Sequence, residues 1–342
     1  MSKELKRGYT TGAHTYMIFN SALDFFLSTK LVSVSKTNKM DNDDLDVTKN
    51  CEIVVTISDK IDDLNLNETT HQAQICTQGS NKLSVYAGIG VGVVTKKGLK
   101  ISPDFPAINP TPLNAMFDIF KKLSLDYENL DLHCSVSITD GENISKQTAN
   151  AKVGVVGGLS ILGTTGIVKP VSSTAYIDSV KTEIEFAKQN EYNPLIFTIG
   201  NSTFSTAKER YDEAQIVEVA NFVYDSIEIS TALEIEKVVF VCGIGKMTKV
   251  YQGFKNTHNR FGSIDFVQLR NDIKNEIGYE VDIESTKTVK GLSIELESVG
   301  LSDELYTMIA KKANEQIKEW FPTSNVEALI LEQLEQKKGT KW

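Results

Sequence analysis

The second half of the chain alternates short apolar segments with longer amphipathic ones, and glycine follows the apolar segments. Leu195–Ile199 and residues 238–241 have the length and the side chains of buried strands, and Gly200 and Gly243 come soon after them. Strand–helix–strand alternation of this kind is typical of a layered α/β domain. The alternation therefore predicts a Rossmann-like domain, in which ligands bind beyond the carboxyl ends of the strands.

Amphipathic segments around these strands predict the helices of this domain. Apolar residues recur at helical spacing in each of them. The expected helices cover about 173–189, 206–226, a segment after Lys246, and two tail segments at 302–320 and 325–337.

The first half of the chain has strands too close together for a purely parallel sheet. Alternating apolar residues predict strands at about 30–34, 51–57, 84–95 and 133–139. A helix is expected to begin after Thr10 or Thr11, because either hydroxyl can accept a bond from an amide of the first turn. A second helix, with Pro112 in its first turn, is expected to end near Leu123.

These patterns together predict an α/β protein of two domains, as the length of 342 residues also suggests. The N-terminal domain, residues 1–152, is expected to be mixed α+β. The C-terminal domain, residues 153–342, is expected to be Rossmann-like α/β with a helical C-terminal tail.

Composition excludes several classes of protein. The hydrophobic fraction of 41% is enough to form a core, so disorder is excluded as the main state. Lys and Arg total 36 against 45 Asp and Glu, and the net charge of −9 disfavours general nucleic-acid binding. No apolar run reaches the roughly 18 residues that cross a bilayer, and the N-terminus does not look like a signal peptide. We therefore expect a cytoplasmic protein that binds neither nucleic acid nor membrane.

Cysteine and histidine usage disfavours a metal centre. The four cysteines are widely spaced without a CxxC pair, and the chain has four histidines without an HExxH motif. The expectation is reduced thiols in the cytosol and no bound metal.

Glycine is densest in a segment that begins the predicted second domain. Five glycines fall within residues 154–166, with Ser160, Thr164 and Thr165 among them. Backbone amides and hydroxyls can cradle a carboxylate, a phosphate or a sugar, and glycine lets a ligand approach the backbone. The alternative is a tight structural crossover between domains, and the residues leave both interpretations open.

Two glycine patterns are not nucleotide motifs. Met247 follows Gly245-Lys246 where a P-loop needs Ser or Thr, and Gly88-Ile89-Gly90 lacks the third glycine of a dinucleotide fingerprint. These departures exclude nucleoside triphosphate hydrolysis and disfavour a standard dinucleotide site.

Two polar segments allow more than one interpretation. The acidic loop with Asp41, Asp43, Asp44 and Asp46 lacks the glycine and the bidentate Glu of a calcium-binding EF-hand, so turn and capping duties, ligand contacts and a metal site stay open. His258 and Arg260 lie close together in sequence. They can bind a carboxylate or handle a proton, although a lone histidine is more often structural.

Eight short strings, taken in their order, resemble one known family. They are GYTTG (8–12), DDLDVT (43–48), GVGVVTKKGL (90–99), PAINP (106–110), GGLSILGTTGIV (157–168), GN (200–201), IGK (244–246) and NTH (256–258). The set is similar to the CbiD family, the cobalt-precorrin-5B (C1)-methyltransferases of anaerobic cobalamin biosynthesis. The resemblance covers about residues 5–270, and the glycine-rich string is its most specific part.

The resemblance implies a fold, a reaction and two groups of site residues. The expected fold is CbiD-like, and the expected reaction transfers a methyl group from S-adenosylmethionine to C1 of a small-molecule corrinoid whose cobalt is part of the substrate. We expect the methyl donor to contact Gly157, Gly158, Ser160, Gly163, Thr164, Thr165 and Gly166. We expect the substrate to contact Thr10, Thr11, Asp43, Asp46, Lys246 and Arg260. His258 is the expected catalytic residue, for proton handling or carboxylate binding. The site is expected at the junction of the two domains, and a homodimer is left open.

Several motif positions depart from the usual family pattern. Ala13 and His14 replace a Thr or Ser and a Cys after GYTTG, and Cys242-Gly243 replaces Gly-His before IGK. Two alternatives therefore stay open. One is a divergent paralogue that methylates another tetrapyrrole, and the other is a non-catalytic corrinoid-binding protein.

Overall fold

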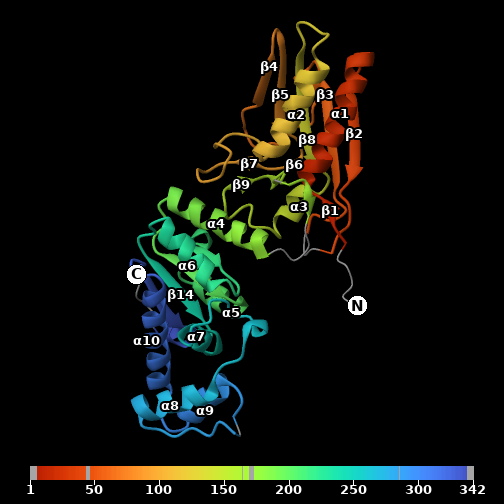
Figure 1. Ribbon diagram of the computed structural model, residues 1–342. Coiled ribbons are helices and arrows are strands. Elements are labelled where there is room, and N and C mark those ends of the chain that lie inside the picture. Colours follow the sequence, from red (N-terminus) through yellow and green to blue (C-terminus); the bar gives the residue numbers. More distant parts are fainter. Residues whose placement is uncertain (1–5, 44–46, 164, 169–172, 285, 337–342) are drawn as a thin grey trace. The chain divides into compact units, whose positions relative to one another are not determined.

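The computed structural model describes residues 6–43, 47–163, 165–168, 173–284 and 286–336 (Figure 1). The chain divides into two compact units, a first unit of residues 1–173 and a second unit of residues 174–342. The first unit continues past residue 152, because short strands between 155 and 168 pair with strands that come earlier in the chain.

The first unit is built on a mixed five-stranded sheet. The strands, in sheet order, are β2 (Ser33–Asn38), β3 (Glu52–Ser58), β8 (Asp131–Ile138), β5 (Asn81–Ala87) and β4 (Gln74–Gln78). Strands β5 and β8 are parallel and the other neighbours are antiparallel. Helices α1 (Thr11–Thr29) and α2 (Pro110–Leu123) contact each other and share a buried core with the sheet. The predicted α+β character of this half is confirmed.

Helix α1 begins where its sequence predicts. The Thr10 hydroxyl accepts a hydrogen bond from the Ala13 amide at 3.1 Å and so caps the first turn. Phe19, Leu23 and Phe26 recur at helical spacing and are buried in the core. This face holds the helix against the sheet because each of these side chains leaves water on folding.

The predicted strand at 84–95 is three shorter strands. After β5 come β6 (Gly90–Val91) and β7 (Val93–Val94), which pair with β10 (Gly158–Leu159) and β9 (Val155–Val156). Gly90 has φ +79°, and a Cβ there would lie 2.0 Å from the Ile138 carbonyl oxygen. The chain therefore turns at this glycine instead of continuing as one strand. Helix α3 (Gly141–Ser145) and the short helix η1 (Ile61–Asp63) complete the unit.

The second unit contains a four-stranded parallel sheet with helices on both faces. Its strands, in sheet order, are β13 (Ile216–Glu218), β12 (Leu195–Ile199), β14 (Val238–Cys242) and β15 (Val326–Ile330). The helices are α4 (Ser173–Gln189), α5 (Asn201–Lys208), α6 (Val223–Ala232), α7 (Ile244–Tyr251), α8 (Phe266–Ile277), α9 (Val289–Glu297), α10 (Ser302–Trp320) and α11 (Leu331–Gln336), with η2 (Glu213–Gln215) and η3 (Asn259–Phe261). The predicted Rossmann-like architecture is confirmed.

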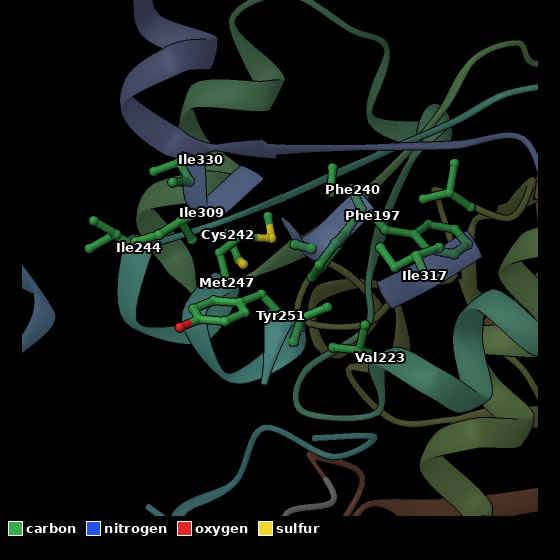
Figure 2. Close-up of a cluster of buried hydrophobic side chains, with 14 of the residues drawn as sticks. Phe197, Val223, Phe240, Cys242, Ile244, Met247, Tyr251, Ile309, Ile317 and Ile330 are labelled. Atoms are coloured by element: carbon green, nitrogen blue, oxygen red, sulfur yellow. The ribbon is translucent and has the colours of Figure 1, made fainter. Parts of the chain in front are cut away.

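Alternate residues of the strands face two separate cores. Phe197 and Phe240 pack with Met247 of α7 and Ile309 of α10 in the larger core (Figure 2). Ile196, on the opposite face of β12, packs in a smaller core that α5 and α11 cover. Buried side chains on both faces explain why these strands read as continuous apolar runs.

Two helix predictions in the second unit are wrong. The segment 206–226 is not one helix, because Asp212 and Gln215 form a capping box and β13 then pairs with β12. Residues 326–330, predicted as helix, form β15 because their apolar side chains complete the sheet beside β14. The predicted helix at 302–320 matches α10 at both ends.

Candidate functional site

The N-terminal string GYTTG folds directly onto the glycine-rich segment. Strand β1 (Gly8–Tyr9) pairs with β11 (Ile167–Val168) in an antiparallel ladder. The Thr10 amide donates to the Gly166 carbonyl oxygen at 3.0 Å, and the Gly12 amide donates to the Leu162 carbonyl oxygen at 2.8 Å. Two strings that lie far apart in sequence therefore form one surface of the first unit.

The two threonines of GYTTG bind to protein atoms. Thr11 is 4% exposed, and its hydroxyl accepts from the Leu162 amide at 2.9 Å and donates to the Leu162 carbonyl oxygen at 3.2 Å. The Thr10 hydroxyl caps α1, as described above. Both residues therefore shape the surface, and direct contact with a substrate stays a prediction.

Three glycines of the segment 157–166 are packed against the protein itself. A Cβ at Gly157 would lie 2.6 Å from the side-chain nitrogen of Asn67, and one at Gly158 would lie 2.3 Å from the Gly90 carbonyl oxygen. A Cβ at Gly163 would lie 2.2 Å from the Thr10 hydroxyl oxygen. Close packing of this kind favours the structural-crossover interpretation for these three positions.

The end of the same segment is more accessible. Thr165 is exposed and donates to the Ile167 carbonyl oxygen at 3.1 Å, and a Cβ at Gly166 would make only ordinary contacts. Ser160 is half-buried and donates to the Asn150 side-chain oxygen at 3.5 Å. Thr164 lies outside the described residues. Contact between the methyl donor and this segment stays a prediction.

Three large apolar residues of these two paired strings are exposed. Tyr9 is 44% exposed, Leu162 is 50% exposed and Ile167 is 43% exposed. We call these three residues the apolar rim. Exposed apolar groups on a surface that also has a polar turn suit a flat ligand with an apolar face.

The acidic loop supports the N-terminal segment. The Asp43 carboxylate accepts from the Lys6 amide at 2.7 Å, and the Asp43 amide donates to the Lys6 carbonyl oxygen at 3.0 Å. Asp41 forms an exposed ion pair with Lys6 at 3.5 Å. These contacts agree with the turn-and-capping interpretation for the two residues, while Asp44 and Asp46 lie outside the described part of the chain. Among the described residues, no three His, Cys, Asp or Glu side chains come together as a metal site.

His14, which departs from the family pattern, is built into the first unit. It is buried, its Nδ1 lies 2.9 Å from the Thr10 carbonyl oxygen, and its Nε2 accepts from the Met40 amide at 3.3 Å. With Nε2 as the acceptor, Nδ1 carries the proton and donates to Thr10. Local hydrogen bonds therefore give both ring nitrogens of His14 a partner at this position.

Lys246 connects the ends of two strands in the second unit. It follows β14 in the first turn of α7, and its Nζ donates to the Asn221 side-chain oxygen at 2.8 Å and to the Thr257 carbonyl oxygen at 3.0 Å. Asn221 comes just after β13. Burial lowers the pKa of the Lys246 ammonium group, and the nearby charge of Lys249 lowers this pKa further.

His258 and Arg260 lie next to this network and are exposed. The His258 Nδ1 accepts from the Arg260 amide at 3.1 Å, so the neutral ring carries its proton on Nε2. The Arg260 guanidinium carbon lies 4.6 Å from the centre of the Phe261 ring. Thr257 is fully buried and donates to the Asn221 side-chain oxygen at 3.0 Å, which fixes the loop before His258.

The predicted site residues therefore form two groups, one in each unit. In the first unit the contacts above bring together Thr10, Thr11, Gly163 and Gly166, with Asp43 bound to the segment just before GYTTG. In the second unit Lys246 joins the loop that carries His258 and Arg260. Sequence reasoning missed Asn67 and Asn221, because nothing in their surroundings in sequence marks them; only the fold brings Asn67 to Gly157 and Asn221 to Lys246.

The four cysteines are buried, and none of them forms a disulfide. Burial raises the pKa of Cys134 and of Cys242, in the second case with the charge of Lys246 opposing the shift. None of the helices in the described part of the chain is long and apolar enough to span a bilayer.

Comparisons with known proteins point to one family. A sequence model of the CbiD family matches residues 1–170. The cobalt-precorrin-5B C(1)-methyltransferase of Methanocaldococcus jannaschii is 32% identical over 337 residues, which cover 93% of this chain and 91% of that protein. The protein of the same name from Clostridium perfringens is 33% identical over 92% of this chain and 87% of its own length. The crystal structure of cobalamin biosynthesis protein (cbiD) from Archaeoglobus fulgidus is 21% identical over 75% of this chain and 83% of that one, with a TM-score of 0.33.

Proposed function

This chain belongs to the CbiD family, and we propose that it transfers a methyl group from S-adenosylmethionine to C1 of cobalt-precorrin-5B. The observation that supports the proposal is the extent of the similarity. Two relatives named as this methyltransferase match more than nine tenths of this chain and most of their own length. The similarity therefore includes both units, not only the segment with the densest glycine.

The reaction needs little acid–base chemistry from the protein. S-adenosylmethionine supplies a methyl group on a sulfonium, which is already activated for transfer. The protein then contributes mainly alignment of the two reacting carbons and exclusion of water, which can account for a large part of a rate enhancement. Surfaces that hold two ligands in register are more important here than a nucleophile.

The apolar rim and the adjoining turn are the part of the first unit that we assign to the macrocycle. Tyr9, Leu162 and Ile167 offer apolar surface for a flat ring, and the exposed Thr165 offers a hydroxyl beside them. Thr10 and Thr11 hold this surface in place through α1 and Leu162.

The cations of the second unit are assigned to the carboxylates of the substrate. Lys246 already donates to two neutral oxygens, and its third N–H can still reach a carboxylate. Arg260 is exposed and can bind a carboxylate through two parallel bonds. His258 offers its Nε2–H as a donor, and proton handling by this ring is its proposed catalytic role.

The sequence points to the glycine-rich segment for the methyl donor, and the second unit offers a competing location at the carboxyl edge of its sheet. The packing described above leaves Thr165 and Gly166 as the accessible residues of the glycine-rich segment. A cytoplasmic location is part of the same proposal, since four cysteines without a disulfide are typical of a reducing compartment.

Transfer of an isotopically labelled methyl group tests the function directly. Purified protein is incubated with cobalt-precorrin-5B and S-adenosylmethionine that carries a ¹³C methyl group. We expect the corrinoid to gain one labelled methyl group, with the label at C1 by carbon NMR. Label at another position or on another tetrapyrrole would favour the divergent paralogue. Corrinoid binding without any transfer, in folded protein, would favour the non-catalytic alternative.

A further inference from the structure

The parallel sheet of the second unit changes winding direction between β12 and β14. The chain passes from β12 to β13 on one side, and then crosses to β14 and β15 on the other side. In open α/β sheets the crevice at such a reversal, outside the carboxyl ends of the strands, is where nucleotides and related ligands bind.

Two glycines at the carboxyl end of β14 have no role in the packing of the protein. A Cβ at Gly243 or Gly245 would meet no atom within 4 Å, and neither backbone lies in the left-handed region. Every other described glycine without a positive φ would place a Cβ 3.2 Å or less from a neighbouring atom. Gly200, directly after β12, has open space too. Glycine in open space lets a ligand approach the backbone.

Glu218 lies at the position that recognises ribose in nucleotide-binding βαβ units. It is the last residue of β13, next to β12 in the sheet, and it follows Gly200 by about 20 residues, the usual separation in that motif. Its side chain is exposed, and within the described residues its carboxylate has neither a hydrogen bond nor an ion pair. A free carboxylate at this position can accept bonds from vicinal hydroxyls.

An aromatic pair lies beside Glu218. The Tyr176 hydroxyl donates to the Glu218 carbonyl oxygen at 2.9 Å, and the Tyr176 and Phe222 rings are 5.5 Å apart at 32°. Burial, followed by the charges of Glu218 and Glu183, raises the pKa of Tyr176 to about 12, so its hydroxyl stays a donor at neutral pH. Tyr176 is 37% exposed and offers a ring face to a nucleobase.

A buried hydroxyl at the end of β12 lacks a partner. Thr198 is 0% exposed, is in register with Glu218, and precedes Gly200 by two residues. Its Oγ1 is one of three buried side-chain polar atoms in the described chain without a hydrogen bond. An unpaired buried hydroxyl is costly, and unpaired groups of this kind concentrate at functional sites.

We propose that the adenosine part of the methyl donor binds at this carboxyl edge, with its ribose hydroxyls on the Glu218 carboxylate. Gly200, Gly243 and Gly245 let the ligand approach the backbone, and Tyr176 offers a face to the base. The proposal rests on the proposed function, and it places the donor outside the segment 157–166 that the sequence predicts.

Calorimetric titration with S-adenosylhomocysteine and its 2′-deoxy analogue tests the ribose contact. Hydrogen bonds to a charged group change affinity by about 10- to 100-fold. We therefore expect Glu218→Gln to weaken S-adenosylhomocysteine binding by about that factor, and to weaken binding of the 2′-deoxy analogue by a clearly smaller factor, because that analogue keeps only the 3′-hydroxyl. Glu209→Gln, an exposed change at the other end of α5, is the matched control and should bind both ligands like the unaltered protein.

The outcomes separate failure of this site from failure of the function. Unaltered affinity of the Glu218→Gln variant for S-adenosylhomocysteine, in protein that binds it, overturns the site and leaves the methyltransferase proposal standing. If the unaltered protein binds neither S-adenosylmethionine nor S-adenosylhomocysteine, with or without a cobalt corrinoid, the function and the site are both overturned.

Discussion

Glycine plays opposite roles in the two units. In the first unit Gly90 and Gly158 lie backbone against backbone, where no side chain fits. In the second unit Gly243 and Gly245 border open space at the end of a parallel strand. The sequence is densest in glycine where the chain packs against itself, and sparser where we place the ligand. Glycine density therefore reports close packing of the chain, whereas an isolated glycine after a parallel strand is the better sign of a ligand site.

The comparison is tested most strongly by adding one methyl group in each unit. Gly158→Ala forces a Cβ to 2.3 Å from the Gly90 carbonyl oxygen, and we expect it to lower the free energy of unfolding by about 3 kcal/mol. Gly243→Ala places a Cβ in open space, and its effect should stay within about 0.5 kcal/mol. Urea unfolding monitored in both variants measures the difference. Equal losses would remove the distinction between the two kinds of glycine.

The hydroxyl of Thr11 should be nearly as important to the first unit. Thr11→Val leaves the Leu162 amide without its partner, while the Leu162 carbonyl oxygen keeps its bond from the Gly12 amide, and we expect the free energy of unfolding to fall by about 1.5 kcal/mol. Thr165→Val, in the same surface but exposed, should change stability by less than about 0.5 kcal/mol. A Thr11→Val variant as stable as the control would mean that water replaces the lost hydroxyl.

Removal of the unpaired hydroxyl in the second unit should instead raise the free energy of unfolding. Thr198→Val keeps the shape of the side chain and removes a buried oxygen that has no partner, so we expect a gain of about 1 kcal/mol. Thermal unfolding without any ligand checks this gain. A loss of stability would show that the hydroxyl is paired in solution, and would weaken its link with a ligand.

The smallest effect is expected at Gly245. Alanine is a better helix former than glycine, and Gly245 lies in the first turn of α7 with open space around it. Gly245→Ala should therefore raise the free energy of unfolding by about 0.5 kcal/mol. Chemical denaturation with duplicate titrations can resolve a difference of that size, and a clear loss would mean that packing, not a ligand, requires this glycine.

Local patterns in the sequence predict the elements whose signals are continuous. The cap at Thr10 and the apolar spacing through Phe26 give the start and the buried face of α1, and the apolar runs give β12 and β14. Strand β13 has only three residues and lies between helical segments, so local spacing does not separate it from them. Residues 326–330 become a strand only because β14 is beside them.

The site was predictable in its parts but not in its arrangement. The strings GYTTG and GGLSILGTTGIV mark residues that do come together, as the bonds of Thr11 and Leu162 demonstrate. No local pattern identifies the residue that occupies the space beside each glycine, such as Gly90 beside Gly158 or Thr10 beside Gly163. The interpretation of a glycine therefore depends on contacts between residues distant in sequence.

The most direct measurement compares S-adenosylhomocysteine binding by two blocked variants in the absence of any corrinoid. Gly245→Leu fills the open space at the end of β14, and Thr165→Trp fills the exposed turn of the glycine-rich segment. We expect Gly245→Leu to lose binding without any loss of thermal stability, and Thr165→Trp to bind like the unaltered protein. Binding retained by Gly245→Leu and lost by Thr165→Trp would contradict the account, and would place the donor in the first unit.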